Sequence, residues 1–208
     1  MVSSLFCFMN TVENLFLNFG LSWTISKLLP YVLAIVLGIV MVYVFRMKIK
    51  RRTPIIRWSC RIVLLILPFI VYFIYAPIYE GDFSNGSLTI EKDAKYNELT
   101  GEKLVIIALP NCPYCLEAME RLKKLKQRLP NAELEFVLCN ADSSNFEWYK
   151  ENSGPDINIR LATDSKAMSQ LAGGLFPTFV FVSGSHLKLW SNNAFGVLAI
   201  DELEDLLQ

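Results

Sequence analysis

Two long stretches without a charged residue limit what this chain of 208 residues can fold into. They cover residues 28–45 and 62–79, and almost every position in them is apolar. A transmembrane helix needs about 20 predominantly apolar residues, with about 17 as the shortest length in use. Helices buried in a soluble protein would carry polar faces, which these stretches lack. We therefore expect two transmembrane helices, at about residues 28–45 and 62–79.

Basic residues gather between the two stretches. Residues 46–61 hold seven lysines and arginines and no acidic residue, whereas Glu80 and Asp82 follow the second stretch. The positive-inside rule places such a basic loop in the cytoplasm, so the region after residue 79 should lie on the opposite side. Membrane lipid is then an expected partner of the loop. Residues 81–208 are mildly acidic, which argues against nucleic acid as a partner.

The segment before the first stretch is harder to assign. Residues 1–27 are strongly apolar, but Asn10, Glu13 and Asn14 interrupt the pattern. We expect an amphipathic helix at the membrane interface or a re-entrant piece packed on the spans, because a third span would bury Glu13 near the bilayer centre. Residues 80–102, with glycine, serine and asparagine near their start, are expected to form a polar linker, within which residues 87–90 can add an edge strand.

A second constraint is the motif Cys112-Pro113-Tyr114-Cys115. Two thiols separated by two residues can close into a reversible disulfide, so the motif is a candidate redox pair. The apolar, β-branched run 104–109 before it predicts a buried strand. After it, apolar residues recur at three- and four-residue steps as far as residue 129, which predicts a helix. Cys112 is therefore expected at a helix N-terminus.

That position has chemical consequences for both thiols. Free N–H groups and the positive end of the helix dipole favour a thiolate, so we expect a lowered pKa for Cys112 and assign it as the nucleophile. Pro113 suits the first helical turn. Cys115 lies one turn further in and is assigned as the resolving thiol, which attacks the mixed disulfide and releases the product.

The same spacing also fits other kinds of site. A structural disulfide or an inert pair would have the same spacing. A zinc site would need two further ligands, yet His186 is the only histidine and no second pair of cysteines at this spacing exists, so no metal is expected. Cys139 ends an apolar run and is expected to be a small buried side chain.

The remaining elements alternate between strands and helices. Strands are expected at 133–139, 157–161, 178–182 and 186–190, and helices at 143–152, 164–171 and 200–208. The order strand, helix, parallel strand predicts an α/β domain.

The order of a strand, a Cys-x-x-Cys motif at a helix start and a later proline at the head of a hairpin resembles thioredoxin-like proteins. The segment Leu175-Phe176-Pro177-Thr178 occupies the place of that family's cis-proline segment. The resemblance implies an α/β thioredoxin-like domain at 103–208, with a central mixed sheet flanked by helices. It also implies that Pro177 is cis and packs against the disulfide, and that the backbone at Phe176 pairs with a substrate peptide. Thr178, Pro113 and Tyr114 would shape the same site.

The region between residues 140 and 177 is longer than in the minimal fold, and this resembles the TlpA-like, membrane-anchored branch. That branch handles disulfides in the bacterial periplasm, which implies a two-pass inner-membrane protein with a periplasmic C-terminal domain. The implied function is thiol–disulfide exchange with protein substrates and an unidentified electron donor or acceptor. No cofactor is implied besides the Cys112–Cys115 disulfide.

Two residues depart from the family pattern. Ile106 stands where many thioredoxins place a buried acid, and Asn111 replaces the aromatic residue before the first cysteine. The direction of electron flow therefore stays open. An alternative from a different class is an accessory subunit of a larger membrane complex, in which the thioredoxin-like domain docks a partner.

Overall fold

A computed structural model describes residues 9–50, 53–78 and 81–207. These residues divide into two compact units, one ending at residue 78 and one beginning at residue 81, and each unit is described by itself. Residues 1–8 of the expected interfacial segment lie outside the described residues.

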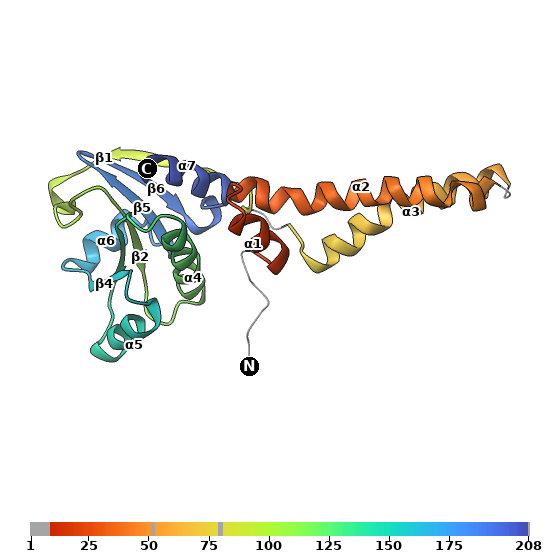
Figure 1. Cartoon of the computed structure of the whole chain (residues 1–208). Helices are drawn as coiled ribbons and strands as arrows, with labels where there is room; N and C mark the ends of the chain where they lie inside the picture. Colours follow the sequence, from red (N-terminus) through yellow and green to blue (C-terminus); the bar gives the residue numbers. More distant parts are fainter. Residues whose placement is uncertain (1–8, 51–52, 79–80, 208) are drawn as a thin grey trace. The chain divides into compact units, whose positions relative to one another are not determined.

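The first unit is built from three helices (Figure 1): α1 (Thr11–Asn18), α2 (Trp23–Lys50) and α3 (Pro54–Tyr75). Helices α2 and α3 are each long and apolar enough to cross a membrane. At 1.5 Å per residue, the 22 residues of α3 span about 33 Å, close to the roughly 30 Å of a hydrocarbon core. No residue of α3 is fully buried, although the rings of Phe69 and Tyr72 contact Tyr31 of α2.

The basic segment between the helices differs from its expected form. Arg46 lies in α2 and Arg57 lies in α3, so most of residues 46–61 are helical rather than a loop. The reason is physical: lysine and arginine are good helix formers, and Pro54 suits the first position of a helix. Helix α3 ends at Tyr75, four residues before the end of the charge-free stretch 62–79.

Helix α1 is fixed at its start by a reciprocal pair of hydrogen bonds. The Asn10 side chain accepts from the backbone N–H of Glu13 at 3.0 Å, and the Glu13 carboxylate accepts from the Asn10 N–H at 2.8 Å. The Asn10 amide also donates to the hydroxyl of Tyr72 at 3.0 Å, which connects α1 to the end of α3. Thus the described part of the expected interfacial segment holds the short helix α1, which packs on α2, and the first turn of α2 itself, which begins at Trp23 and not at residue 28.

A glycine brings α2 and α3 together. A Cβ atom added at Gly38 would lie 2.2 Å from the carbonyl oxygen of Leu65, so only glycine permits this approach of the two backbones. Small residues at the crossing of apolar helices commonly serve this purpose in membranes.

The second unit is a mixed sheet covered by helices on both faces (Figure 1). Its strands are β1 (Leu88–Glu91), β2 (Lys103–Ala108), β3 (Leu134–Leu138), β4 (Asn158–Leu161), β5 (Thr178–Ser183) and β6 (His186–Ser191). Its helices are α4 (Pro113–Arg128), α5 (Ser143–Ser153), α6 (Ser165–Leu171) and α7 (Val197–Leu207). Two short 3₁₀ helices, η1 (Ala94–Tyr96) and η2 (Asn192–Ala194), complete it.

The strand order within the described residues is β1-β6-β5-β2-β3-β4. Strands β2, β3 and β4 run parallel, whereas β5 is antiparallel to both β2 and β6, and β1 is antiparallel to β6. The parallel strands are joined by α4 and α5, as parallel pairs require a crossover. This confirms the expected α/β architecture with a central mixed sheet.

The sheet separates two layers of core. Val105 and Ile107 of β2 belong to a buried cluster that includes Met168 of α6. Successive side chains of a strand point to opposite faces, so Leu104, Ile106 and Ala108 face the other layer, where α4 packs. Helix α4 buries Cys115, Ala118, Met119, Leu122 and Leu125.

The segment 81–102 is not the linker expected from its composition. The indole N–H of Trp190 donates to the side chain of Asn85 at 3.0 Å, and Leu99 is fully buried. Strand β1 (Leu88–Glu91) pairs with β6 at the sheet edge, which confirms the edge strand expected at 87–90, one residue further along the chain. The segment is therefore part of the folded unit, because β1 pairs with the sheet, Asn85 binds Trp190 and Leu99 is buried.

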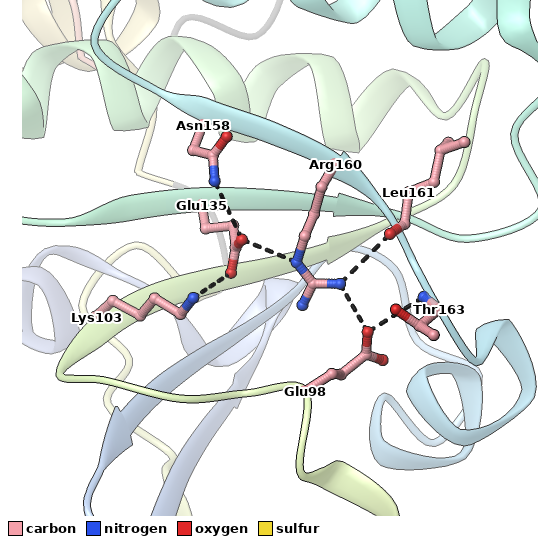
Figure 2. A network of polar contacts seen from close by, with 7 residues as sticks. All are labelled: Glu98, Lys103, Glu135, Asn158, Arg160, Leu161 and Thr163. Atoms are coloured by element: carbon pink, nitrogen blue, oxygen red, sulfur yellow. Dashed lines mark hydrogen bonds and ion pairs between the residues drawn. The ribbon is translucent and has the colours of Figure 1, made fainter.

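Figure 2 shows a polar network around one buried carboxylate, that of Glu135 in β3. Lys103 lies 2.7 Å from one of its oxygens, and Arg160 of β4 lies 2.8 Å from the other. Asn158 donates to the second oxygen at 3.2 Å, and Arg160 continues to Glu98 at 2.7 Å. The network joins β2, β3 and β4, which explains a charged residue within an otherwise apolar strand.

Candidate redox site

The cysteine motif lies where β2 leads into α4. Ala108 ends the strand, and Asn111 has a left-handed backbone with φ of 59°, a conformation that asparagine tolerates better than most residues. Cys112 then occupies the N-cap of α4, and Pro113 occupies the first turn. The predicted helix start is thereby confirmed.

The two sulfur atoms have different surroundings. Cys112 is partly exposed, and its sulfur accepts a hydrogen bond from the backbone N–H of Cys115 at 3.3 Å. Cys115 is fully buried. Both are present as free thiols. One thiol of the pair can therefore meet a large reactant, and the other can be reached only through its neighbour.

Burial raises the pKa of the Cys115 thiol, and a hydrogen bond with Cys112 raises it further. A hydrogen bond from the backbone of Leu109 acts in the opposite direction and favours the thiolate. When the pair is reduced, Cys115 is thus a neutral thiol, with one backbone donor in place for its charged form.

The proline segment approaches the same end of the sheet. The Phe176–Pro177 peptide bond is cis, as the resemblance implied. Thr178 pairs with Ile107 across β5 and β2, so Pro177 lies beside the end of the strand that leads to the cysteines. The Thr178 hydroxyl donates to the carbonyl of Leu175 at 2.6 Å and holds the turn before the proline.

Side chains around the motif differ in exposure. Tyr114 is 57% exposed and Leu175 is 59% exposed, whereas Phe176 packs partly against the core cluster. The apolar surface offered to solvent therefore comes from Tyr114 and Leu175. The role of Phe176 in presenting a substrate backbone stays a prediction.

Cys139 is separate from the pair. Its side chain belongs to the core cluster with Val105 and Ile107, on the face of the sheet opposite α4. Burial raises its pKa, opposed by a hydrogen bond with Ser169. The expectation of a small buried side chain is confirmed. Within the described residues, no group of three or more His, Cys, Asp or Glu side chains could hold a metal ion.

One residue of this site was not singled out from the sequence. The hydroxyl of Tyr149, in α5, donates to the carbonyl of Leu109 at 3.3 Å, three residues before Cys112. Tyr149 is distant in the sequence from the motif, and no local pattern indicates that α5 brings it here. The only available signal was the extra length between residues 140 and 177.

A mixed sheet of this order, with a Cys-x-x-Cys motif capping a helix and a cis-proline beside it, defines a thioredoxin-like domain. Residues 81–184 match the family model described as Redoxin, which spans half of the chain. The chain belongs to the Redoxin family.

Comparison with solved structures finds a similarity to a secreted disulfide oxidoreductase of Mycobacterium tuberculosis, described as homologous to E. coli DsbE. The TM-score is 0.41 and the identity 18%, over 53% of this chain and 84% of that one. No curated protein matches the chain.

Proposed function

We propose that the chain is a membrane-anchored thiol–disulfide oxidoreductase that acts on protein disulfides or dithiols outside the cytoplasm. The observation that carries the proposal is the unequal exposure of the pair: Cys112 is partly exposed at a helix N-terminus and Cys115 is fully buried. This arrangement suits one attacking thiol and one resolving thiol. Membership of the Redoxin family supports the same chemistry.

The reaction begins with the reduced pair. The Cys112 thiol loses its proton to solvent, and the thiolate attacks one sulfur of a substrate disulfide. A bond forms between Cys112 and that sulfur, while the other substrate sulfur leaves as a thiolate and takes a proton from solvent. Cys115 then loses its proton and attacks Cys112, which forms the Cys112–Cys115 disulfide and releases the second substrate thiolate. Two electrons have passed from the pair to the substrate.

In reverse, the same steps oxidise a substrate dithiol. Repeated reduction of substrates requires a dithiol reductant that returns the pair to its reduced form, and repeated oxidation requires a disulfide oxidant. We expect no further cofactor, because thiol–disulfide exchange needs only the sulfur atoms.

Substrate contact is assigned to the exposed apolar side chains on either side of the pair. Tyr114 and Leu175 offer apolar surface to a chain segment flanking a disulfide. The backbone before Pro177 would pair with that segment, as in thioredoxin-like proteins. Such backbone pairing places the disulfide without demanding a particular sequence.

Membrane anchoring is assigned to α2 and α3. Both have the length and composition of spans, and the many exposed apolar side chains of α3 are stable only in lipid or against another protein. The basic residues between the helices orient this pair with their connection in the cytoplasm. The second unit then lies on the opposite side, in the periplasm of a bacterium.

The experiment is reduction of insulin disulfides by the full chain, purified in detergent and supplied with dithiothreitol. We expect catalysis above the uncatalysed rate, complete loss in Cys112→Ser, and unchanged activity in Cys139→Ala. The Cys139 variant is a matched control because it removes a buried thiol on the other face of the sheet.

Activity that persists in Cys112→Ser would contradict the proposal. If neither reduction nor oxidation occurs, and a stable partner co-purifies equally well with Cys112→Ser, the accessory-subunit function is favoured instead.

A further inference from the structure

Tyr149 is an unusual neighbour for the redox pair because it comes from α5, in the segment that lengthens this domain. Its side chain is 1% exposed. Its ring stacks on Phe136 of β3, with centroids 5.5 Å apart, and meets the edge of Trp148 at 5.2 Å. Two aromatic contacts therefore fix the ring in one orientation.

The hydroxyl of this ring reaches the backbone that carries the pair. It donates to the carbonyl oxygen of Leu109 at 3.3 Å. The backbone of Leu109 also forms the hydrogen bond that favours the Cys115 thiolate. Leu109 is thus held by Tyr149 on one side and supports Cys115 on the other.

The residues after Leu109 explain why the hydrogen bond from Tyr149 matters for the shape of this loop. The next residue, Pro110, has no N–H to donate, and Asn111 adopts a left-handed conformation with φ of 59°. A loop of this kind depends on side-chain donors for its fixed shape. The Tyr149 hydroxyl is such a donor at the first residue after the strand.

Electrostatics keep the hydroxyl in its donor form. Burial raises the pKa of Tyr149, and negative charge on Cys115 and Cys112 raises it further. Formation of either thiolate therefore opposes loss of the phenol proton. The hydroxyl stays a neutral donor throughout the exchange reaction.

We propose that Tyr149 is a positioning residue for the second step of exchange: its hydroxyl holds Leu109 so that the Leu109 backbone supports the Cys115 thiolate during attack on the mixed disulfide. The inference rests on the proposed function. In this step the Cys115 thiol gives its proton to solvent, the Cys115–Cys112 bond forms and the bond from Cys112 to the substrate breaks. The released substrate thiolate takes a proton from solvent.

The test uses Ellman's reagent, an aromatic disulfide that releases one coloured thiolate in each of the two steps. The full chain is reduced, with Cys7, Cys60 and Cys139 replaced by alanine so that only the pair reacts. Wild-type Tyr149 and Tyr149→Phe are mixed with the reagent under single-turnover conditions. The phenylalanine keeps the ring and removes only the hydroxyl.

We expect the first phase to change by less than about twofold and the second to slow about tenfold, equivalent to about 1.4 kcal/mol in activation free energy. Tyr96→Phe is the matched control, because Tyr96 is another buried tyrosine, in the core cluster on the other face of the sheet. It should leave both phases unchanged. A general loss of structure would expose both thiols to the reagent and change both phases, so a slower second phase beside an unchanged first phase separates positioning from folding.

Equal rates in Tyr149→Phe and wild type, or equal slowing of both phases, would overturn the role of Tyr149 while leaving the proposed function intact. If the wild-type pair gives no first phase, or if Cys112→Ser gives the same trace, the proposed function fails and this inference fails with it.

Discussion

Thr178 pairs with Ile107 across the antiparallel strands β5 and β2, and this register brings the cis-proline segment to the end of the strand that leads to Cys112. The two halves of the site, separated by the whole α5 and α6 region, are aligned by one strand pair. A shift of one residue would turn Thr178 to the other face of the sheet. The geometry of the site therefore depends on the register of the sheet.

The first prediction concerns the reactivity of the thiols. We expect iodoacetamide to alkylate Cys112 at neutral pH, while Cys115 and Cys139 stay protected in the native state. Both buried thiols have raised pKa values, so they remain neutral as the pH rises beyond the range in which an exposed cysteine ionises. Peptide mass spectrometry after timed alkylation measures each site.

The same shifts predict lower stability in alkaline solution. Above the unfolded-state pKa, the unfolded chain releases protons that the native thiols retain, so the free energy of unfolding falls with rising pH.

For the alkylation experiment, modification of Cys115 as fast as that of Cys112 in the native protein would contradict the assignment of the two roles.

The second prediction concerns the polar network of Figure 2. Glu135→Ala should reduce the free energy of unfolding by about 2 kcal/mol, because Lys103 and Arg160 lose the carboxylate that they share. Urea titration followed by tryptophan fluorescence measures the change. Glu120→Ala is the control, since its pair with Lys123 is on the surface and should be worth less than about 1 kcal/mol. Equal losses in both variants would show that the network adds no stability.

The third prediction concerns the cap of α5. The Asp142 carboxylate accepts a hydrogen bond from the backbone N–H of Asn145 at 2.8 Å, and this bond lowers the pKa of Asp142 from its ordinary value of 3.8. The stabilisation is complete above that value and is lost as the pH falls through the lower pKa of the folded state. Asp142→Ala should therefore lower the melting temperature at neutral pH.

The difference in melting temperature between wild type and Asp142→Ala should shrink toward zero in strong acid, where Asp142 is protonated and has lost its charge. Thermal unfolding of both proteins at several pH values measures it. A difference that does not depend on pH would mean that the charge of Asp142 is not what stabilises α5.

The fourth prediction concerns the helix pair. Gly38→Val should separate α2 from α3, because the new side chain would overlap the carbonyl of Leu65. We expect a lower thermal stability of the full chain in detergent, measured by the onset of aggregation. Gly20→Ala is a useful contrast: nothing lies within 4 Å of a Cβ there, and its strain comes from a positive φ alone. A Gly38→Val protein as stable as wild type would argue against this close approach.

The regular elements of the second unit could be predicted from the sequence because each carries its own periodicity. The apolar run before Cys112 and the three- and four-residue steps after it define β2 and α4 locally. The same holds for the hairpin of β5 and β6, where Gly184 separates two apolar runs.

Other features could not be predicted because they depend on contacts between distant residues. The composition around Asn85 is that of a linker, and only the fold shows that this segment belongs to the sheet, through the bond of Asn85 to Trp190 and the pairing of β1 with β6. Tyr149 looks like one more aromatic residue of a helix until the fold brings it to Leu109. Glu135 lies within an apolar strand, and its partners Lys103 and Arg160 lie on neighbouring strands, which no local pattern of the sequence identifies.

The two outer strands of the sheet have a consequence for the behaviour of the protein at high density. Strands β1 and β4 are each four residues long and carry Glu91 and Arg160. Short edge strands with charged side chains offer few unpaired backbone groups to a strand of a neighbouring molecule. They therefore oppose aggregation through strand addition. Copies of the protein at high density can thus remain separate and keep Cys112 accessible.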